Sequence, residues 1–275
     1  VGAGIVGVTT AWEMAADGHD VTVFERHGAV AEEASFANAG VVAPGYVTPW
    51  AAPGMPSKVL GQLFARHAAA RLSWPLSSSE LRWLWRWWRA CDPATYRANR
   101  ARLQRLAFYS RQRLQELTER LDLTYDRSPG YLVLLRGERE RTLVQAGLSV
   151  LREAGARVEE VDPEAARAIE PALNPDQPLA GALHLPDDGV GNCRQFAMQL
   201  RRQAEGIGAR FEFLANVAPL DPAAPTVLQV STSGQPSRPE RFDAVVMCGG
   251  AGSTDLLRRV GLRLPLARVH GYSVS

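Results

Sequence analysis

Three glycines at the start of the chain constrain its fold more than any other feature. Gly2, Gly4 and Gly7 have the spacing G-x-G-x-x-G, in which a strand turns tightly into a helix whose first amides face a pyrophosphate. Gly2 permits the turn, Gly4 lets phosphate oxygens approach the backbone, and Gly7 lets the helix lie close to the strand. The spacing alone is weak evidence, because a chain with 24 glycines contains many glycine-bearing turns.

The residues that follow support a nucleotide-binding turn. Residues 4–16 suit a helix that ends before Gly18, and residues 20–24 form a short β-branched and aromatic run typical of a buried strand. Glu25 ends that strand roughly 20 residues past the glycines, where a carboxylate accepts a hydrogen bond from a ribose 2′-OH and repels a 2′-phosphate. Arg26 beside it weakens the argument against a 2′-phosphate. The alternative is a glycine turn in an ordinary α/β protein.

Composition excludes several other classes of function. The chain has 275 residues, 46% of them hydrophobic, which is enough for one large or two ordinary domains. Its 31 basic and 29 acidic side chains give a net charge of +2, so no broad field favours nucleic acid. Cys91, Cys193 and Cys248 are far apart and indicate neither a disulfide framework nor a zinc site. The histidines show no metal-ligand spacing, and no nucleophile motif is present.

The ends of the sequence are unusual for such a fold. Only Val1 precedes Gly2, whereas a strand typically has about 5 residues, so we expect the chain to be truncated within its first strand. No signal peptide precedes the first motif, and no run of about 18 apolar residues indicates a membrane span.

A small polar segment at residues 32–40 leads into an extended, proline-broken segment at residues 40–50, and both are expected to be loop. Ser35 and Asn38 are able to hydrogen-bond a ligand, but local turn contacts explain them equally well.

Taken with the glycine turn and Glu25, the string at residues 35–54 resembles the bacterial FAD-dependent D-amino-acid dehydrogenases, which are relatives of the D-amino-acid and glycine oxidases. The similarity continues through residues 81–85, 91–92, 181–186, 188–193 and 271–273, and it covers essentially the whole chain. Its most specific part is the run Ser-Phe-Ala-Asn-Ala-Gly at residues 35–40.

The resemblance implies an FAD cofactor. The first turn and Glu25 would hold the ADP half, Ser35 and Asn38 would lie near the pyrophosphate and flavin, Val217 would meet the adenine through its backbone, and a second glycine turn at residues 249–251 would contact the flavin. The implied cofactor-binding residues are Gly2, Ala3, Gly4, Ile5, Val6, Gly7, Glu25, Arg26, Ser35, Asn38, Ala39, Gly40, Val217, Gly249, Gly250 and Ala251.

The second glycine turn follows residues 242–248, which we expect to be a buried strand, and precedes a helix at residues 254–260 with Ser253 as its N-cap. From chemistry alone it would be only a well-formed βα turn. His270 and Tyr272 approach the substrate pocket on one interpretation, and ordinary strand packing is the alternative. The arginine that relatives use for the substrate carboxylate is expected beyond residue 275.

We therefore predict an α/β fold: a Rossmann-like FAD-binding domain with an inserted mixed α+β substrate domain, truncated at both ends. The FAD-binding domain would comprise residues 1–49 and 187–262. The substrate domain would comprise residues 50–186, and residues 263–275 would begin a return into it.

Aromatic residues are densest in a helical stretch near residue 85. Leu81, Leu84, Trp85 and Trp88 share one helix face, which core packing explains most simply. The alternative is a basic, aromatic helix on a membrane surface or a partner, because indole rings favour the headgroup region.

The resemblance implies oxidation of a D-amino acid to its imino acid, which water hydrolyses to a 2-oxo acid and ammonia. Electrons would pass to a quinone or other respiratory-chain acceptor, and the protein would be cytoplasmic, in peripheral contact with the inner face of the bacterial inner membrane. The flavin would carry the chemistry, so no catalytic residue is named. The alternatives are a related oxygen-dependent amine or glycine oxidase and an inactive nucleotide-binding fragment.

Overall fold

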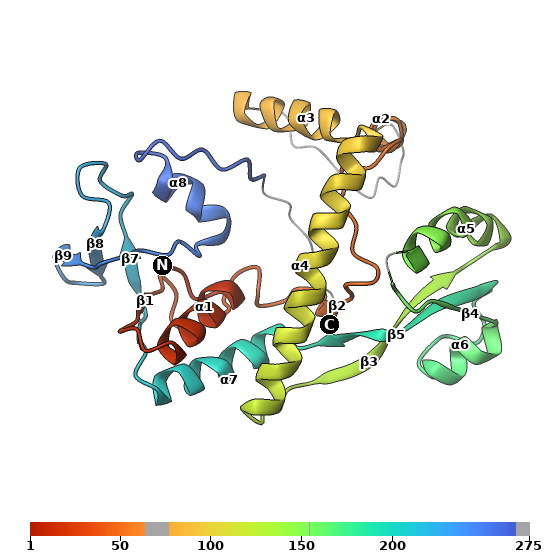
Figure 1. The fold of residues 1–275 in the computed structure, drawn as a ribbon, viewed down its shortest axis with the longest axis horizontal. Coiled ribbons are helices and arrows are strands. Elements are labelled where there is room, and N and C mark those ends of the chain that lie inside the picture. The colour runs from red at the N-terminus through yellow and green to blue at the C-terminus, as the bar shows by residue number, and fades with distance from the viewer. Residues whose placement is uncertain (64–76, 154, 268–275) are drawn as a thin grey trace. The chain divides into compact units, whose positions relative to one another are not determined.

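The computed structural model describes residues 1–63, 77–153 and 155–267, which form two compact units (Figure 1). The first unit contains residues 1–40, 118–126 and the chain from residue 192 onward, and the second contains residues 41–117 and 127–191. The helices are α1 Ile5–Ala16, α2 Met55–Leu63, α3 Ser78–Ala90, α4 Pro93–Arg120, α5 Glu138–Glu153, α6 Pro163–Ile169, α7 Cys193–Gly206, the short 3₁₀ turn η1 Gly250–Gly252 and α8 Ser253–Leu257. The strands are β1 Thr22–Phe24, β2 Val41–Val42, β3 Arg127–Leu135, β4 Glu159–Val161, β5 Gly181–Gly191, β6 Arg210–Glu212, β7 Ala215–Val217, β8 Val227–Thr232 and β9 Arg238–Arg241.

The first unit has the α/β arrangement that the sequence predicts. β1 pairs in parallel with β6, so that Thr22 lies opposite Arg210, and helix α7 precedes β6. β7, β8 and β9 form a separate antiparallel sheet, with the hairpin turn at Gly234. Parallel pairing of β1 and β6 requires a crossover connection, which here contains the whole of the second unit as well as α7.

Helices α1 and α7 pack against each other and lie side by side in Figure 1. Ala11 and Ala15 are buried on α1, and Ala197 and Ala204 are buried on α7. Small residues let two helix backbones approach closely, and they leave room for the larger buried side chains of the same faces. Those side chains are Val8, Trp12, Phe196 and Leu200.

The core between β1 and the antiparallel sheet is apolar. Phe24, Ala215, Leu220, Leu228 and Val230 are all buried there, and Val230 is fully inaccessible. Burying an aliphatic or aromatic side chain of this size contributes about 1.5–3 kcal/mol. This cluster therefore fixes the end of β1, from which Glu25 follows.

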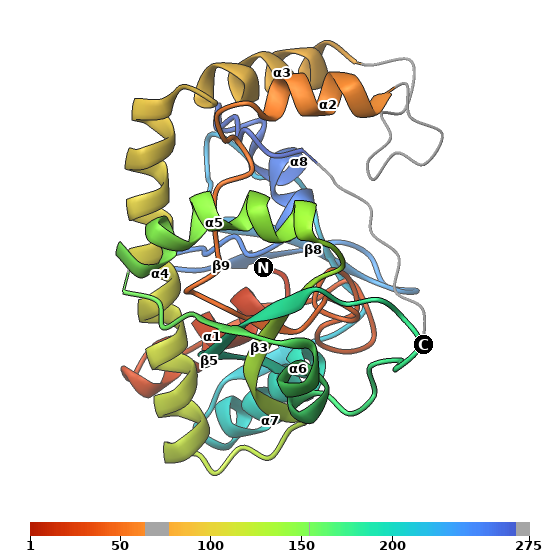
Figure 2. The ribbon, with the colours of Figure 1, turned by 90° about the vertical axis from the view of Figure 1, so that its right-hand side faces the viewer.

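The second unit is organised around the long strand β5. β3 pairs with it along one edge, and β2 and β4 pair with different ends of the other edge, all in antiparallel register. Helix α5 lies above and α6 below the end of this sheet in Figures 1 and 2. Buried side chains of α5, of β3 and β5 and of the segment after α5 form one apolar cluster, which contains Leu135, Leu148, Leu151, Val158, Leu183 and Leu185.

Local signals explain where the helices of this unit begin and end. Asp162 caps α6 by accepting a hydrogen bond from the Ala165 amide at 2.8 Å, and Pro163 occupies the first helical position. Gly155, which follows α5, has a φ of +80°, a backbone conformation that glycine adopts without strain.

Two expectations about the second glycine turn are wrong. Residues 242–248 form no strand, because at this edge they pair with a single residue, Val1. The Val1 ammonium donates a hydrogen bond to the Val246 carbonyl, and the Cys248 amide donates one to the Val1 carbonyl. Residues 243, 244 and 246 of the segment are exposed rather than buried. Ser253 is the first residue of α8 and makes no capping hydrogen bond, whereas Gly252 occupies the N-cap position.

Core packing is also the wrong explanation for the aromatic stretch. No residue of α3 is buried, and Leu81, Trp85 and Trp88 are 54%, 53% and 61% exposed. Leu84 is half-buried, so the predicted stripe lies mainly on the outer side of the helix. Among the described residues, the structure contains no helix with the length and apolarity that a membrane crossing needs.

A buried carboxylate connects the loop after β2 with the central strand of the second unit. Asp188 on β5 accepts a hydrogen bond from the Gly45 amide at 3.2 Å through Oδ1, and the Arg111 guanidinium lies 3.6 Å from the same oxygen. Its side chain is 3% exposed, and Oδ2 has no hydrogen-bond partner among the described residues. Burial raises the pKa of Asp188, although the Gly45 amide and Arg111 act in the opposite direction.

This carboxyl makes stability depend on pH. A raised pKa means that the folded protein holds the proton more tightly than the unfolded chain does. The stabilisation from Asp188 is therefore greatest below the pKa of the unfolded chain, where the carboxyl is protonated in both states. It is lost as pH rises through the pKa of the folded protein. Relative to Asp188→Asn, the wild-type protein should therefore lose unfolding free energy as pH rises from about 4, the pKa of an unfolded aspartate, through the raised pKa of the folded protein. Denaturant unfolding of both proteins across that range measures the difference, in which the titration of all other groups cancels.

Asp187→Asn is the matched control, because the Asp187 side chain is adjacent in sequence but 55% exposed. The Asp187 charge is the smallest contribution to the raised pKa of Asp188, so the profile of this variant should deviate from that of the wild type much less than the profile of Asp188→Asn does. If the Asp188→Asn profile runs parallel to the wild type, burial of an ionisable Asp188 does not affect stability.

Candidate functional site

The first glycine turn is held against the second by a close backbone approach. Gly2 has a φ of +94°, and its amide donates a hydrogen bond to the Phe24 carbonyl at 2.9 Å. A Cβ placed on Gly2 would lie 2.7 Å from the Cys248 carbonyl oxygen and 3.0 Å from the Gly249 Cα. Both the conformation and the space therefore require glycine, and the two glycine turns are neighbours in space.

Gly7 has the packing role that the motif predicts. A Cβ on this residue would lie 1.9 Å from the Gly2 carbonyl oxygen, a distance that no side chain tolerates. Gly4 differs, because it has a φ of −67° and the nearest atom to a Cβ there is the Ser35 hydroxyl at 3.4 Å. The backbone at Gly4 is therefore open on the side where a ligand would approach.

Ser35 belongs to this turn, and Asn38 does not contact it. The Ser35 hydroxyl accepts a hydrogen bond from the Ile5 amide at 3.0 Å, in the first turn of α1. Because a hydroxyl also carries a hydrogen, Ser35 is still able to donate to a ligand oxygen beside the positive end of the helix. Asn38 is exposed and accepts a hydrogen bond from the Gly40 amide at 3.0 Å, which is a local turn contact.

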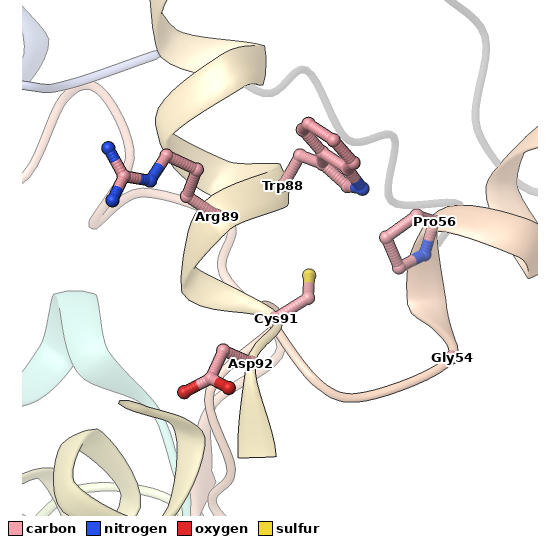
Figure 3. A pocket seen from close by; sticks show the side chains of 6 residues that line it. All are labelled: Gly54, Pro56, Trp88, Arg89, Cys91 and Asp92. Carbon is pink, nitrogen blue, oxygen red and sulfur yellow. The ribbon is translucent and has the colours of Figure 1, made fainter. Parts of the chain in front are cut away.

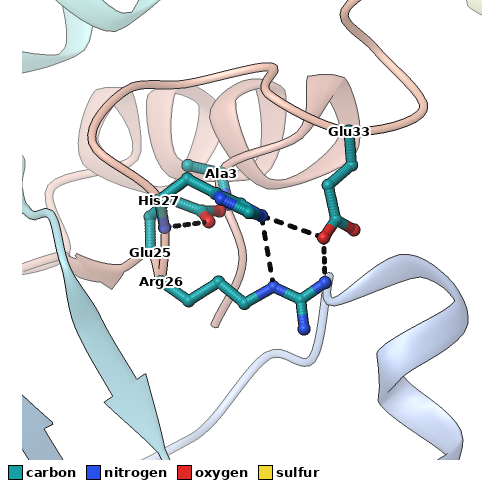
Figure 4. A network of polar contacts seen from close by, with 5 residues as sticks. All are labelled: Ala3, Glu25, Arg26, His27 and Glu33. Carbon is teal, nitrogen blue, oxygen red and sulfur yellow. Dashed lines mark hydrogen bonds and ion pairs between the residues drawn. The ribbon is translucent and has the colours of Figure 1, made fainter.

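Glu25 is buried and holds the turn through both of its carboxylate oxygens (Figure 4). Oε2 accepts a hydrogen bond from the Ala3 amide at 2.7 Å, and Oε1 accepts one from the His27 amide at 2.9 Å. The side chain therefore joins the end of β1 to the glycine turn. A carboxylate offers about four lone-pair sites, so these two bonds leave acceptor capacity for a hydroxyl of a ligand.

Arg26 lies in an exposed polar network next to this carboxylate (Figure 4). Its guanidinium pairs with Glu33, and His27 Nε2 lies 2.9 Å from the same Glu33 oxygen. His27 and Glu33 were not predicted as site residues, because neither belongs to a motif and their proximity depends on the path of the loop after β1.

The other predicted residues of the first unit lie around the same turns. Val217 ends β7, whose first residue, Ala215, donates a hydrogen bond from its amide to the Glu25 carbonyl at 2.9 Å. Gly250 begins the 3₁₀ turn with a φ of +52°, and Ala251 in that turn is exposed.

Half of the sixteen predicted cofactor-binding residues therefore come from segments far apart in sequence and meet in the first unit. Hydrogen bonds or close approaches in this region involve Gly2, Ala3, Gly4, Ile5, Gly7, Glu25, Ser35 and Gly249. Val6 at the start of α1 is 61% exposed. His270 and Tyr272 lie outside the described residues.

The described part of the chain contains no group of three or more His, Cys, Asp or Glu side chains that could hold a metal ion. Its cysteines are free, and burial raises the pKa of the Cys91 thiol. What the first unit offers chemically is backbone amides, one buried carboxylate and one hydroxyl around two glycine turns, a set suited to binding phosphate and ribose groups.

The sequence matches the family described as DAO, FAD dependent oxidoreductase, over residues 1–275. It is 40% identical over 277 residues to the D-amino acid dehydrogenase of Cereibacter sphaeroides, covering 100% of this chain and 63% of that protein. It is 39% identical over 278 residues to the D-amino acid dehydrogenase of Rhizorhabdus wittichii, covering 100% and 66%. The chain thus spans less than two thirds of the length of both relatives.

The fold is similar to that of a solved glycine oxidase from Geobacillus kaustophilus. The TM-score is 0.63 at 24% sequence identity, and the similarity covers 96% of this chain and 57% of that one.

The two carboxylates of Figure 4 should respond differently to the same substitution. Glu25→Gln replaces one acceptor oxygen by an NH₂ group, so either the Ala3 amide or the His27 amide would face a donor instead of an acceptor. We therefore expect the unfolding free energy to fall by about 1–3 kcal/mol. Glu33→Gln removes an exposed ion pair and should change stability by less than about 1 kcal/mol. Denaturant unfolding of the two variants in parallel measures both changes, and equal losses would contradict the role assigned to Glu25.

Proposed function

Because this chain belongs to the DAO family of FAD-dependent oxidoreductases, we propose that it is part of an enzyme that oxidises D-amino acids to 2-oxo acids and ammonia. We further propose that the electrons pass to an acceptor other than oxygen. The observation that carries the proposal is the 40% identity, across the full chain, to a D-amino acid dehydrogenase.

The geometry of the first unit fits the cofactor of the family. The pyrophosphate of FAD would approach the open backbone at Gly4, beside the first amides of α1 and the Ser35 hydroxyl. The free acceptor sites of Glu25 would receive the ribose hydroxyl, and the end of β7 at Val217 would lie by the adenine. The second turn at residues 249–251 would approach the flavin, because Gly2 holds it against the first.

In this assignment the chain supplies binding and orientation. FAD, when bound, would accept the hydride of the amino acid, and with it the two electrons of the Cα–H bond. The substrate loses a hydride and a proton to become an imino acid, and water then releases ammonia and the 2-oxo acid. Arg26 and Asn38 have local partners, so their part in binding would require those contacts to change.

We assign residues 1–49 and 187–262 to the FAD-binding domain, residues 50–186 to the substrate domain, and residues 263–275 to the start of a return into it. Most of this division follows the two compact units, but residues 41–49 and 187–191 lie in the second unit, and residues 118–126 and 263–267 lie in the first. A quinone or another respiratory-chain component is the proposed electron acceptor, which would favour a cytoplasmic protein in peripheral contact with the inner membrane.

Anaerobic titration with D-alanine tests the proposal directly in the protein made from its complete reading frame. We expect D-alanine to bleach the visible flavin absorbance and L-alanine to leave it unchanged. With a redox dye as acceptor, ammonia should form without hydrogen peroxide. A flavin that D-alanine does not reduce would contradict the proposal, and peroxide formation from glycine in air would favour an oxidase instead.

A further inference from the structure

Helix α3 presents two adjacent rows of side chains to solvent. Leu81, Trp85 and Trp88 form an apolar row at spacings of i, i+4 and i+7, and all three are more than half exposed. The second row has the same spacing one residue later and contains the exposed Arg82, Arg86 and Arg89. At 100° per residue, the apolar row spans one side of the helix and the arginines lie directly beside it.

The opposite side of α3 is less exposed. Trp83, Leu84 and Trp87 are half-buried, which distinguishes them from the exposed tryptophans of the outer row. The helix thus has a less exposed side and an outer side on which apolar surface is contiguous with positive charge.

The ends of α3 are fixed by hydrogen bonds. Ser77 and Glu80 form a capping box, in which the Ser77 amide donates to Glu80 Oε2 at 2.7 Å and the Glu80 amide donates to Ser77 Oγ at 3.3 Å. Glu80 is the only acidic residue of the helix, and its carboxylate is held at the N-terminus by this cap. The arginine row therefore has no neighbouring acidic side chain on its own helix.

Beyond the last turn of α3, a pocket of about 320 Å³ separates this helix from the start of α2 (Figure 3). The Trp88 indole and the Pro56 ring face each other across it, so its walls continue the apolar row. Asp92 lies at its floor, and its carboxylate accepts a hydrogen bond from the Thr95 amide at 2.9 Å as part of the start of α4. On the other side of Trp88, the Arg89 guanidinium lies 5.1 Å from the Trp85 ring, which is a cation–π contact.

We propose that the outer side of α3 is a docking surface for a lipid bilayer that contains anionic headgroups. Tryptophan rings favour the boundary between headgroups and acyl chains, and a helix with one apolar row and flanking arginines lies in the plane of that boundary. Guanidinium groups form paired hydrogen bonds with phosphate, so the arginine row favours anionic lipid over zwitterionic lipid. This inference deepens the proposed function, because it supplies the contact with a membrane-resident acceptor.

Vesicle co-sedimentation tests the surface without any requirement for turnover. The protein from the complete reading frame should bind phosphatidylcholine vesicles containing about 30 mol% phosphatidylglycerol, bind pure phosphatidylcholine more weakly, and release from the anionic vesicles as salt rises. Trp85→Ser with Trp88→Ser should weaken binding to both kinds of vesicle by on the order of 10-fold.

Arg82→Gln, Arg86→Gln and Arg89→Gln together should remove the preference for anionic vesicles. At about 5-fold per arginine, the loss is on the order of 100-fold. Leu106→Ser with Tyr109→Ser is the matched control, because these residues of α4 are equally exposed, at 61% and 60%, but lie outside the proposed surface. Its binding should equal that of the wild type.

Three outcomes would overturn the docking surface: no binding of the wild type to anionic vesicles, an equal loss in the α4 control, or unchanged binding of the α3 variants. Recovery of the wild-type protein as a self-associated complex, without vesicle binding, would count equally against it and would favour a protein partner. The reduction of flavin by D-alanine is measured separately in solution, so failure of one proposal is distinguishable from failure of the other.

Discussion

The structure of the first unit depends on the absence of side chains at Gly2 and Gly7. The Gly2 carbonyl oxygen occupies the space that a Cβ on Gly7 would need, and the Cys248 carbonyl and Gly249 occupy the space beside Gly2. Overpacking by even one methyl group typically costs about 1–3 kcal/mol, and the distances here are shorter than any real Cβ contact. Helix α1, strand β1 and the second glycine turn therefore keep their relative positions only with glycine at both sites.

Glu25 adds a polar constraint to this packing. Its carboxylate is buried and joins the end of β1 to the Ala3 amide, so the same side chain that the family motif assigns to ribose also organises the glycine turn. A residue with both roles would present its remaining acceptor sites in a fixed direction before a ligand arrives. Preorganisation of this kind reduces the conformational entropy lost on binding.

The sequence predicted the parts of the site that depend on local backbone requirements. The roles of Gly2 and Gly7, a helix predicted at residues 4–16 and observed at 5–16, and the strand before Glu25 follow from spacing and periodicity. The contact between Ser35 and Ile5 could not be predicted in this way, because it joins residues 30 positions apart through the path of a loop. Periodicity identified the apolar row of α3 but not the side that faces solvent, since tryptophans occur both in the exposed row and on the less exposed side of the helix. The segment at residues 242–248 has strand composition, but a strand also needs a partner of sufficient length.

Gly4 offers the most direct measurement of whether the first turn binds the cofactor. Its φ is negative and a Cβ there would meet only the Ser35 hydroxyl, at 3.4 Å, so Gly4→Ala should leave the unfolding free energy nearly unchanged. The added methyl group would nevertheless stand where phosphate oxygens approach the backbone. The dissociation constant for FAD, measured by quenching of flavin fluorescence in the protein from the complete reading frame, should therefore rise by at least about 10-fold. A stable Gly4→Ala variant that binds FAD as tightly as the wild type would contradict the assignment of this turn to the cofactor.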